Sequence, residues 1–448
     1  MSAGHIPEIH VGIVRSGDLD LFFEGTYLSK GKSIEGKAEA VLRGEEICVQ
    51  QEGVLFACGR EIILSPADLV RGRFEIHDVR IGIGFHWEQK EIQRFPGSLK
   101  LIISEGQVQA INLVPLEDYL ASVISSEMRE DSFPEFLKAH AILSRSWLLA
   151  QMEKQVHLRA SREPCVHSYE GDDEYIRWYD REDHLHFHVC ADDHCQRYQG
   201  LTRAQNPEVA RAVRETAGKV LVYAGHICDA RFSKCCGGVS EEFQYCWEPE
   251  PHPYLRRVDD NPDGHVINGD DLKVEVNARA FIQDAPEAFC NTRDAGLLSR
   301  VLNDYDLGSP DFYRWEVSYS QEEISSLIRE KSGMDFGKIL DLIPVERGES
   351  GRLVKLKIKG AVRTLTVGKE LEIRRWLSKT HLYSSAFTVE KEEVRDGIPG
   401  KFRFRGAGWG HGVGLCQIGA AVMASRGYAY EDILKHYFVN AGIEKRYE

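Results

Sequence analysis

The hydrophobic pattern of the chain changes its period near residue 115, and this change limits the folds open to it. Residues 8–115 hold short β-rich runs, such as 9–14 and 99–103, that are separated by glycine or charged turns. Such runs are typical of a compact β-domain. From Leu116 onward, apolar residues recur at intervals of three and four, which predicts a helix opened by Pro115. The chain is therefore predicted to be an α+β protein.

The rest of the chain mixes both periods. A second helix is predicted over residues 132–152, followed by a polar stretch at 160–200. A breaker-rich joint at 259–264 precedes a further α+β region, and a glycine-punctuated strand–loop–helix occupies 403–423. We expect four parts: a β-rich N-terminal domain (1–110), a core with the candidate catalytic residues and a metal loop (111–260), an inserted α+β region (261–400) and a Gly-rich C-terminal segment that packs back on the core (401–448).

The charge balance limits the partners. The 448 residues include 56 Lys and Arg against 70 Asp and Glu, a net charge of −14. Binding to a phosphate backbone rests on Lys and Arg, so neither nucleic acid nor an anionic membrane surface is expected as a partner. No apolar run approaches the ~18 residues of a spanning helix. The first residues also lack the basic and apolar segments of a secretory signal.

One carboxyl group falls on the apolar face of the first predicted helix. Continuing the stripe from Leu116 by 3, 4, 7, 8 and 11 residues leads to Glu127. Burial and the free carbonyls of a helix end both disfavour a carboxylate and raise its pKa. Such a Glu can stay protonated near neutral pH and act as a general acid. The alternative is a helix that ends at Ser126 and leaves Glu127 pointing to water.

A second group of residues suits a metal ion. His184, Cys190, His194 and Cys195 are close in sequence, with His186 and His188 nearby, and thiolate and imidazole at this density suit Zn²⁺. The cysteines number eleven, and seven of them fall between 165 and 246. This uneven and odd set favours reduced thiols with a metal over a disulfide framework. The alternative is an ordinary polar loop.

The third group is the glycine-rich run 406–414, which contains Trp409 and His411. It matches neither the G-x-G-x-x-G nor the G-x4-G-K-[ST] spacing of phosphate-binding loops. Small residues around Trp409 would let a bulky ligand come close, and the apolar face of an indole suits a sugar ring. The alternative is a tight turn between a strand and a helix.

Several blocks of the chain resemble the stage II sporulation protein D (SpoIID/LytB) family. The most specific block is the glycine-rich run with its continuation, residues 406–420, and the blocks together run from about residue 8 to 443. The matching blocks are residues 114–128, 133–147, 190–200, 232–240, 253–255 with Trp247, 406–420 and 433–437.

This resemblance implies a lytic transglycosylase. Such an enzyme cleaves the MurNAc–GlcNAc bond of peptidoglycan, preferably in strands stripped of stem peptides, and leaves 1,6-anhydro-MurNAc ends. Glu127 stands where the family has its catalytic acid. The implied zinc is structural, with Cys190, Cys195, His184 and His194 as its ligands and His188 as a rival. The implied candidates for lining the glycan groove are Arg145, Gln196, Tyr198, Ser240, Trp409 and His411.

Two other functions remain open. Part of the family is described as stimulating a cell-wall amidase, so the chain could bind glycan without cutting it. A two-carboxylate hydrolase would instead use Asp118 or Glu130 beside Glu127. The family varies at Cys235, Cys236 and Cys416, so these thiols are given no role. The resemblance also implies a place in the cell envelope, for which the chain itself shows no signal.

Overall fold

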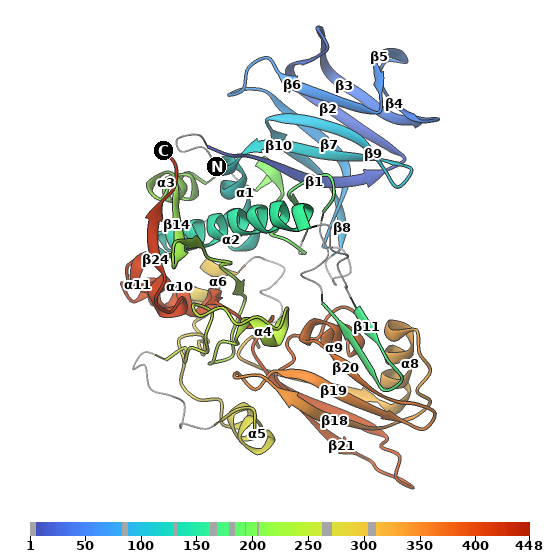
Figure 1. Cartoon of the computed structure of the whole chain (residues 1–448), viewed down its shortest axis with the longest axis vertical. Helices are drawn as coiled ribbons and strands as arrows, with labels where there is room; N and C mark the ends of the chain where they lie inside the picture. Colours follow the sequence, from blue (N-terminus) through green and yellow to red (C-terminus); the bar gives the residue numbers. More distant parts are fainter. Residues whose placement is uncertain are drawn as a thin grey trace. The chain divides into compact units, whose positions relative to one another are not determined.

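The computed structural model describes residues 6–82, 88–129, 132–161, 168–178, 184–192, 194–203, 206–261, 271–302 and 311–448. The protein is α+β, as predicted, with a strand-rich N-terminal part (Figure 1). Among the described residues, none of the helices combines the length and the apolar character that crossing a membrane requires.

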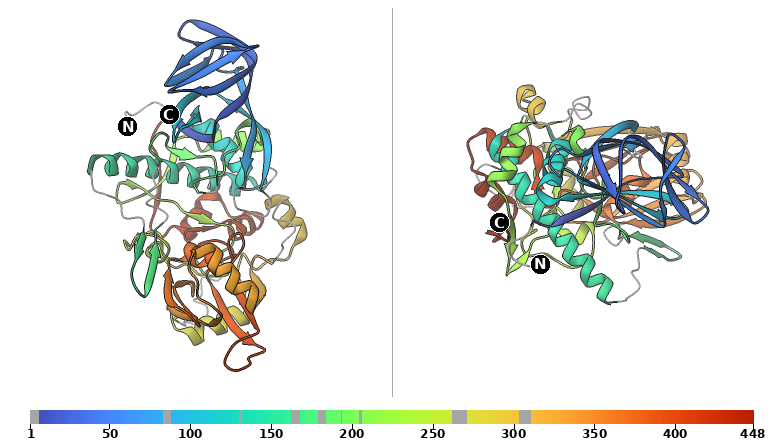
Figure 2. Two further views of the ribbon diagram at one scale, coloured as in Figure 1. Left: turned by 90° about the vertical axis from the view of Figure 1, so that its right-hand side faces the viewer. Right: turned by 90° about the horizontal axis from the view of Figure 1, so that it is seen from above.

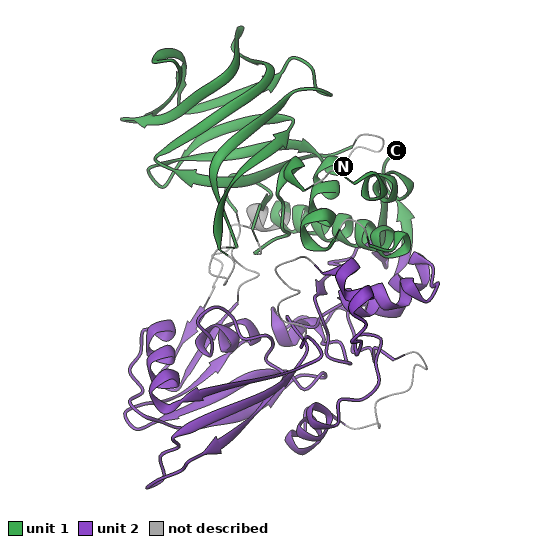
Figure 3. Ribbon diagram, turned by 180° about the vertical axis from the view of Figure 1, so that it is seen from behind, with its two compact units in different colours: residues 1–160, 184–221, 443–448 green, residues 161–183, 222–442 purple. Residues whose placement is uncertain are grey.

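The chain divides into two compact units (Figure 3). Unit 1 contains residues 1–160, 184–221 and 443–448, and unit 2 contains 161–183 and 222–442. The segment 184–221 therefore returns to the unit that the N-terminal strands begin. The predicted division into four parts, with its boundaries, stays a prediction.

An eleven-stranded sheet forms most of unit 1, in the order β13-β1-β10-β9-β6-β2-β3-β4-β5, with β7 joined to β2 and β8 to β7. On the side away from β3, strand β2 pairs with β7 up to Glu24 and with β6 from Tyr27. The change of partner coincides with an irregular register between β2 and β3 at Phe23–Tyr27. Such an irregularity bends a strand and changes its partner. The strands are β1 (Glu8–Ser16), β2 (Asp18–Ser29), β3 (Lys32–Arg43), β4 (Glu46–Gln51), β5 (Val54–Gly59), β6 (Glu61–Pro66), β7 (Arg73–Ile81), β8 (Gln89–Pro96), β9 (Ser98–Ser104), β10 (Gln107–Pro115) and β13 (Val189–Cys190).

Three helices of unit 1 lie together at one end of this sheet (Figures 1 and 2). They are α1 (Leu116–Glu127), α2 (Pro134–Ser161) and α3 (Pro207–Glu215). Helix α1 follows β10 directly, and the apolar stripe that predicted it is buried. Helix α2 begins at Pro134, whose fixed φ and missing N–H suit the first position of a helix.

Unit 2 contains two larger sheets. One has the order β11-β12-β20-β19-β18 and the other β17-β22-β21. Helices α8 and α9 belong to this unit, and their apolar residues share a core with the strands around Trp315 and Trp376. The elements are β11 (Ser168–Glu170), β12 (Glu174–Arg177), β17 (Arg314–Ser320), α8 (Gln321–Ser332), β18 (Ile339–Arg347), β19 (Leu353–Gly360), β20 (Thr364–Gly368), α9 (Glu370–Trp376), β21 (Phe387–Glu392) and β22 (Lys401–Ala407).

The glycine-rich block lies beside the segment around Cys235, which is far from it in the sequence. Strand β16 (Phe232–Ser233) pairs in parallel with β23 (Leu415–Cys416), and Cys235 bridges to Trp409. The block continues into α10 (Gln417–Ser425), as the predicted strand–loop–helix requires. The remaining elements are β14 (Lys219–Tyr223), β15 (His226–Ile227), α4 (Phe243–Cys246), α5 (Glu275–Asp284), α6 (Ala295–Val301), α11 (Tyr430–Tyr437) and β24 (Gly442–Lys445).

Candidate functional site

The predicted metal loop is attached to the edge of the unit 1 sheet. Strand β13 pairs in parallel with β1, placing Val189 beside Val11 and Cys190 beside Gly12. A Cβ on Gly12 would lie 2.5 Å from the ring of Phe187. Only glycine therefore lets Phe187 cover the strand here, and the position of Cys190 depends on that packing.

The loop brings the four predicted metal ligands together. The ligand atoms of His184, Cys190, His194 and Cys195 all lie within 4.8 Å of one another. His184 Nε2 lies 3.3 Å from Cys195 Sγ, and His194 Nδ1 lies 3.5 Å from Cys195 Sγ and 4.0 Å from Cys190 Sγ. A tetrahedral zinc with ordinary bond lengths holds its sulfur and nitrogen ligands about 3.6 Å apart. The donor set and its spacing therefore fit a zinc ion.

The surroundings of Cys190 favour the thiolate, which is the form that binds metals. Hydrogen bonding with Cys195, and then with His184 and His194, lowers the pKa of Cys190 to about 2. All ten cysteines in the described part of the chain are free of disulfide bonds, while Cys165 lies outside it.

His188 does not belong to the group of four that the described residues form. Its Nδ1 accepts a hydrogen bond from the backbone N–H of His10 at 3.1 Å, and the two rings stack 4.8 Å apart. His186 is exposed and is likewise outside the group. Between the rival imidazoles, the geometry thus favours His184 and His194.

Glu127 is the last residue of α1. The helix ends there because Met128 takes an extended conformation, with φ −136° and ψ 168°. The Glu127 side chain is half-buried, and its Oε1 accepts a hydrogen bond of 2.9 Å from the backbone N–H of Arg197. The alternative, a helix that stops at Ser126 with Glu127 directed only to water, is wrong. The metal loop itself holds the carboxyl group, two residues after Cys195.

A pair of stacked tyrosines lies beside both groups. Tyr119 and Tyr198 stack at 5.1 Å, and the Tyr198 hydroxyl donates to Asn112 Oδ1 at 2.6 Å. Burial raises the pKa of Tyr119 well above its usual value, and nearby charge on Cys195, Cys190 and Glu127 raises it further. Tyr119 therefore has the cluster and Glu127 as neighbours. In the sequence, Tyr119 is distinguished only as a member of the apolar stripe of the first helix.

Four of the residues predicted to line a glycan groove are buried. The exposed fractions of Arg145, Gln196, Tyr198 and Ser240 are 0%, 1%, 1% and 1%. The prediction that these four line a glycan groove is wrong, because side chains without solvent contact cannot touch a polymer. Gln196 accepts from the Tyr119 hydroxyl at 3.4 Å. The Ser240 hydroxyl instead bridges backbone groups of residues 256 and 258.

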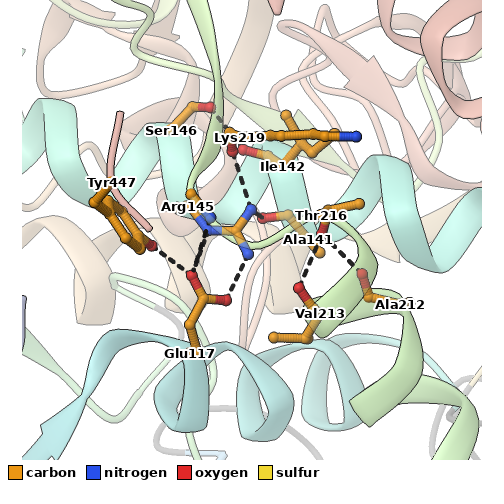
Figure 4. Close-up of polar contacts among 11 residues, drawn as sticks. Glu117, Ala141, Ile142, Arg145, Ser146, Ala212, Val213, Thr216, Lys219 and Tyr447 are labelled. Atoms are coloured by element: carbon orange, nitrogen blue, oxygen red, sulfur yellow. Dashed lines mark hydrogen bonds and ion pairs between the residues drawn. The ribbon is translucent and has the colours of Figure 1, made fainter. Parts of the chain in front are cut away.

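Arg145 has a structural contact in the interior of unit 1 (Figure 4). Its guanidinium reaches from α2 to Glu117 on α1, with Nε 3.0 Å from Oε1 and Nη2 2.6 Å from Oε2. A third donor, Nη1, bonds the carbonyl of Lys219 at 3.0 Å. The Tyr447 hydroxyl also donates to Glu117. Arg145 therefore connects two helices, the start of β14 and the C-terminal segment.

The other two candidate groove residues, Trp409 and His411, are half-buried in unit 2. Trp409 stacks on Phe312 with ring centroids 4.8 Å apart, and His411 contacts the ring of Trp247 at 4.7 Å. Burial lowers the pKa of His411 well below its usual value, so this imidazole is neutral. That they bind glycan stays a prediction.

A buried acid beside the glycine-rich block predicts a pH effect on stability. Burial raises the pKa of Glu241 to about 7, and its Oε2 accepts from the Ser350 hydroxyl at 2.7 Å. An unfolded Glu titrates near 4.3. Between this pH and about 7, the folded state therefore binds more protons than the unfolded state. The free energy of unfolding should therefore fall as pH rises from about 5 to 8. Glu241→Gln should flatten this slope in denaturant titrations. The exposed Glu346→Gln should keep it, and equal slopes for wild type and Glu241→Gln would contradict the prediction.

The fold and the site define an α+β protein in which a half-buried glutamate at a helix end is held by a Cys₂His₂ loop. The model of the stage II sporulation protein family matches residues 104–223, which include Glu127 and all four cluster residues. The model of a domain of unknown function (DUF8618) matches residues 241–414.

Curated relatives agree with the first match. The chain is 26% identical to stage II sporulation protein D of Bacillus amyloliquefaciens, over 75% of this chain and 76% of that protein. It is 23% identical to the protein of the same name from Bacillus subtilis (strain 168), with the same coverage. An amidase enhancer of Bacillus subtilis (strain 168) is 26% identical over 52% of this chain, which spans only 32% of that longer protein. Residues 104–223 thus match the stage II sporulation protein family, and the chain is similar to stage II sporulation protein D over 75% of its length.

Proposed function

We propose that the protein is a lytic transglycosylase that cleaves MurNAc–GlcNAc bonds of peptidoglycan glycan, with Glu127 as general acid and base. The observation that supports this most is the half-buried carboxyl group at the end of α1, held by the metal loop through the Arg197 N–H. The match to the stage II sporulation protein family and the similarity to stage II sporulation protein D support a cell-wall role.

The proposed reaction needs one carboxyl group. Protonated Glu127 gives its proton to the glycosidic oxygen while the MurNAc ring gains oxocarbenium character. The resulting carboxylate takes the proton of the C6 hydroxyl of the same MurNAc, whose oxygen then closes the 1,6-anhydro ring. One proton is given and one regained, and no water enters. A hydrogen bond from a backbone N–H favours the carboxylate, so the Arg197 N–H assists the first step, in which Glu127 gives up its proton.

A two-carboxylate hydrolase is less well supported. Asp118 is exposed at the first turn of α1, about 13 Å along the helix axis from Glu127. The carboxyl pairs of glycosidases are about 5–9.5 Å apart. Glu130, the other carboxyl considered, lies outside the described residues.

His184, Cys190, His194 and Cys195 would hold a zinc ion in a closed four-ligand site. Zinc in such a site is structural and supplies folding energy rather than an open catalytic position. It would fix the loop that provides the Arg197 N–H to Glu127.

A second candidate function is a glycan-binding modifier that stimulates a cell-wall amidase. The relative named amidase enhancer favours it. Here the same loop and helix would hold a glycan strand without cleaving it.

Product analysis distinguishes these functions. Purified protein is incubated with glycan strands freed of stem peptides, and the products are identified by mass spectrometry. We expect 1,6-anhydro-MurNAc ends. Reducing MurNAc ends would instead support a hydrolase, and intact glycan that co-sediments with the protein would support the modifier.

The metal loop gives a separate prediction. A Cys190→Ser/Cys195→Ser variant should carry about one zinc ion fewer than the wild type, because one four-ligand site is lost. Elemental analysis of protein purified under reducing conditions measures this. Cys228→Ser, which removes a buried thiol outside the cluster, is the matched control and should leave the zinc content unchanged. An equal zinc content in the wild type and the double variant would show that these residues do not form a zinc site.

A further inference from the structure

A second group of potential metal ligands is buried in unit 2. It consists of Cys236, Asp260, Cys290 and Cys416, whose ligand atoms lie within 4.8 Å of one another. Their exposed fractions are 2%, 0%, 2% and 0%. They come from four segments, and 180 residues separate Cys236 from Cys416.

The distance between two of the thiols matches that between ligands of one metal ion. Cys236 Sγ lies 3.6 Å from Cys290 Sγ. Two thiolates on a tetrahedral zinc are about 3.8 Å apart, whereas a disulfide bond is about 2.05 Å long. The Cys236 and Cys290 sulfurs are thus at ligand spacing, and all four ligand atoms lie within 4.8 Å of one another.

Cys416 is placed where a thiolate is stabilised. It is the N-cap residue of α10, so its side chain lies at the positive end of the helix dipole. Its Sγ also accepts a hydrogen bond from the backbone N–H of Cys236 at 3.2 Å.

Asp260 is oriented by its own partners. Its Oδ2 accepts from the backbone N–H of Cys290 at 2.9 Å, and its Oδ1 accepts from the Tyr437 hydroxyl at 2.6 Å. A Cβ on Gly419 would lie 2.6 Å from that Oδ1 and 2.4 Å from the tyrosine oxygen. Glycine at this position lets α10 approach the carboxylate. Hydrogen bonds of this kind orient the ligands of metal sites.

A packed core without a metal does not explain this arrangement well. Burying polar groups is costly, and burying a carboxylate beside thiols is more so. A divalent cation bonded to the carboxylate and the sulfurs would offset this cost.

We propose that Cys236, Asp260, Cys290 and Cys416 form a second, structural site for a thiophilic divalent ion, of which zinc is the representative. On binding, the ion replaces the protons of the three thiols, which pass to solvent, and bonds to three sulfurs and one carboxylate oxygen. It would join the segment after β16, the two segments around 260 and 290, and the start of α10. The proposal is independent of the reaction proposed for Glu127.

Zinc content tests the proposal. Reduced wild-type protein should carry about two zinc ions, one for each four-ligand site. Cys290→Ser/Cys416→Ser and Cys190→Ser/Cys195→Ser should each carry about one, with Cys228→Ser as the buried-thiol control. A Cys290→Ser/Cys416→Ser protein with the wild-type zinc content would overturn the second site, as would a Cys190→Ser/Cys195→Ser protein without zinc.

A second measurement covers the case in which the Cys290→Ser/Cys416→Ser protein does not fold. Cobalt(II) is exchanged into Cys190→Ser/Cys195→Ser, which keeps the whole second group. We expect the strong sulfur-to-cobalt absorption of a three-thiolate site. When Asp260→Asn is added to this variant, the visible cobalt bands should shift. Absence of the sulfur-to-cobalt absorption, or a Cys236–Cys290 disulfide detected by peptide mass, would contradict the proposal.

Discussion

Glu127→Gln is expected to abolish the release of 1,6-anhydro-MurNAc ends from denuded glycan. The amide cannot give a proton to the glycosidic oxygen or take one from the C6 hydroxyl, so the rate should fall by at least ~10²–10⁴-fold. Gln has the same shape, and its amide oxygen can still accept from the Arg197 N–H at the position of Oε1. Folding and glycan binding should therefore be unchanged. Initial rates by mass spectrometry, thermal unfolding and co-sedimentation with glycan measure the three properties.

The matched control is Asp118→Asn, which neutralises an exposed carboxyl group on the same helix. It should keep the wild-type rate. If Glu127→Gln cleaves glycan as fast as the wild type, Glu127 is not the acid. If Asp118→Asn loses activity as completely as Glu127→Gln, a mechanism with a single carboxyl group is wrong.

The sequence was most informative where the signal is local. The three-and-four stripe predicted α1, and the structure ends that helix at Glu127, because helix periodicity depends on neighbouring residues only. His184, Cys190, His194 and Cys195 are close in sequence, and their residue types already indicated a metal site. The sequence could not show that His188 lies outside the group. Its position depends on the pairing of β13 with β1 and on a hydrogen bond from the backbone of His10.

The resemblance to the family was less informative about individual roles. Arg145, Gln196, Tyr198 and Ser240 lie in matching blocks, but a matching residue can be kept for packing as well as for contact with substrate. The structure buries all four. The second thiol group escaped the sequence analysis for a different reason. Its members lie up to 180 residues apart, and no local spacing indicates that they meet.

Arg145→Ala is expected to destabilise the protein strongly without a direct effect on glycan. The Arg145 side chain has an exposed fraction of 0% and that of Glu117 16%, and two hydrogen bonds join them. Removing the guanidinium takes the charged partner from the Glu117 carboxylate and one hydrogen bond from the Lys219 carbonyl, and breaking a buried ion pair in this way costs about 3–5 kcal/mol. Denaturant unfolding measures the loss.

Arg211→Ala is the control for a surface ion pair, since Arg211 and Glu208 are both largely exposed, and it should cost no more than about 1 kcal/mol. Unfolding of Arg145→Ala at the wild-type denaturant concentration would contradict the structural role. A second readout separates that role from contact with substrate. For protein that remains folded, the KM for denuded glycan should be unchanged, because the guanidinium is enclosed between α1 and α2 (Figure 4). A raised KM with normal stability would instead support the prediction that Arg145 contacts glycan.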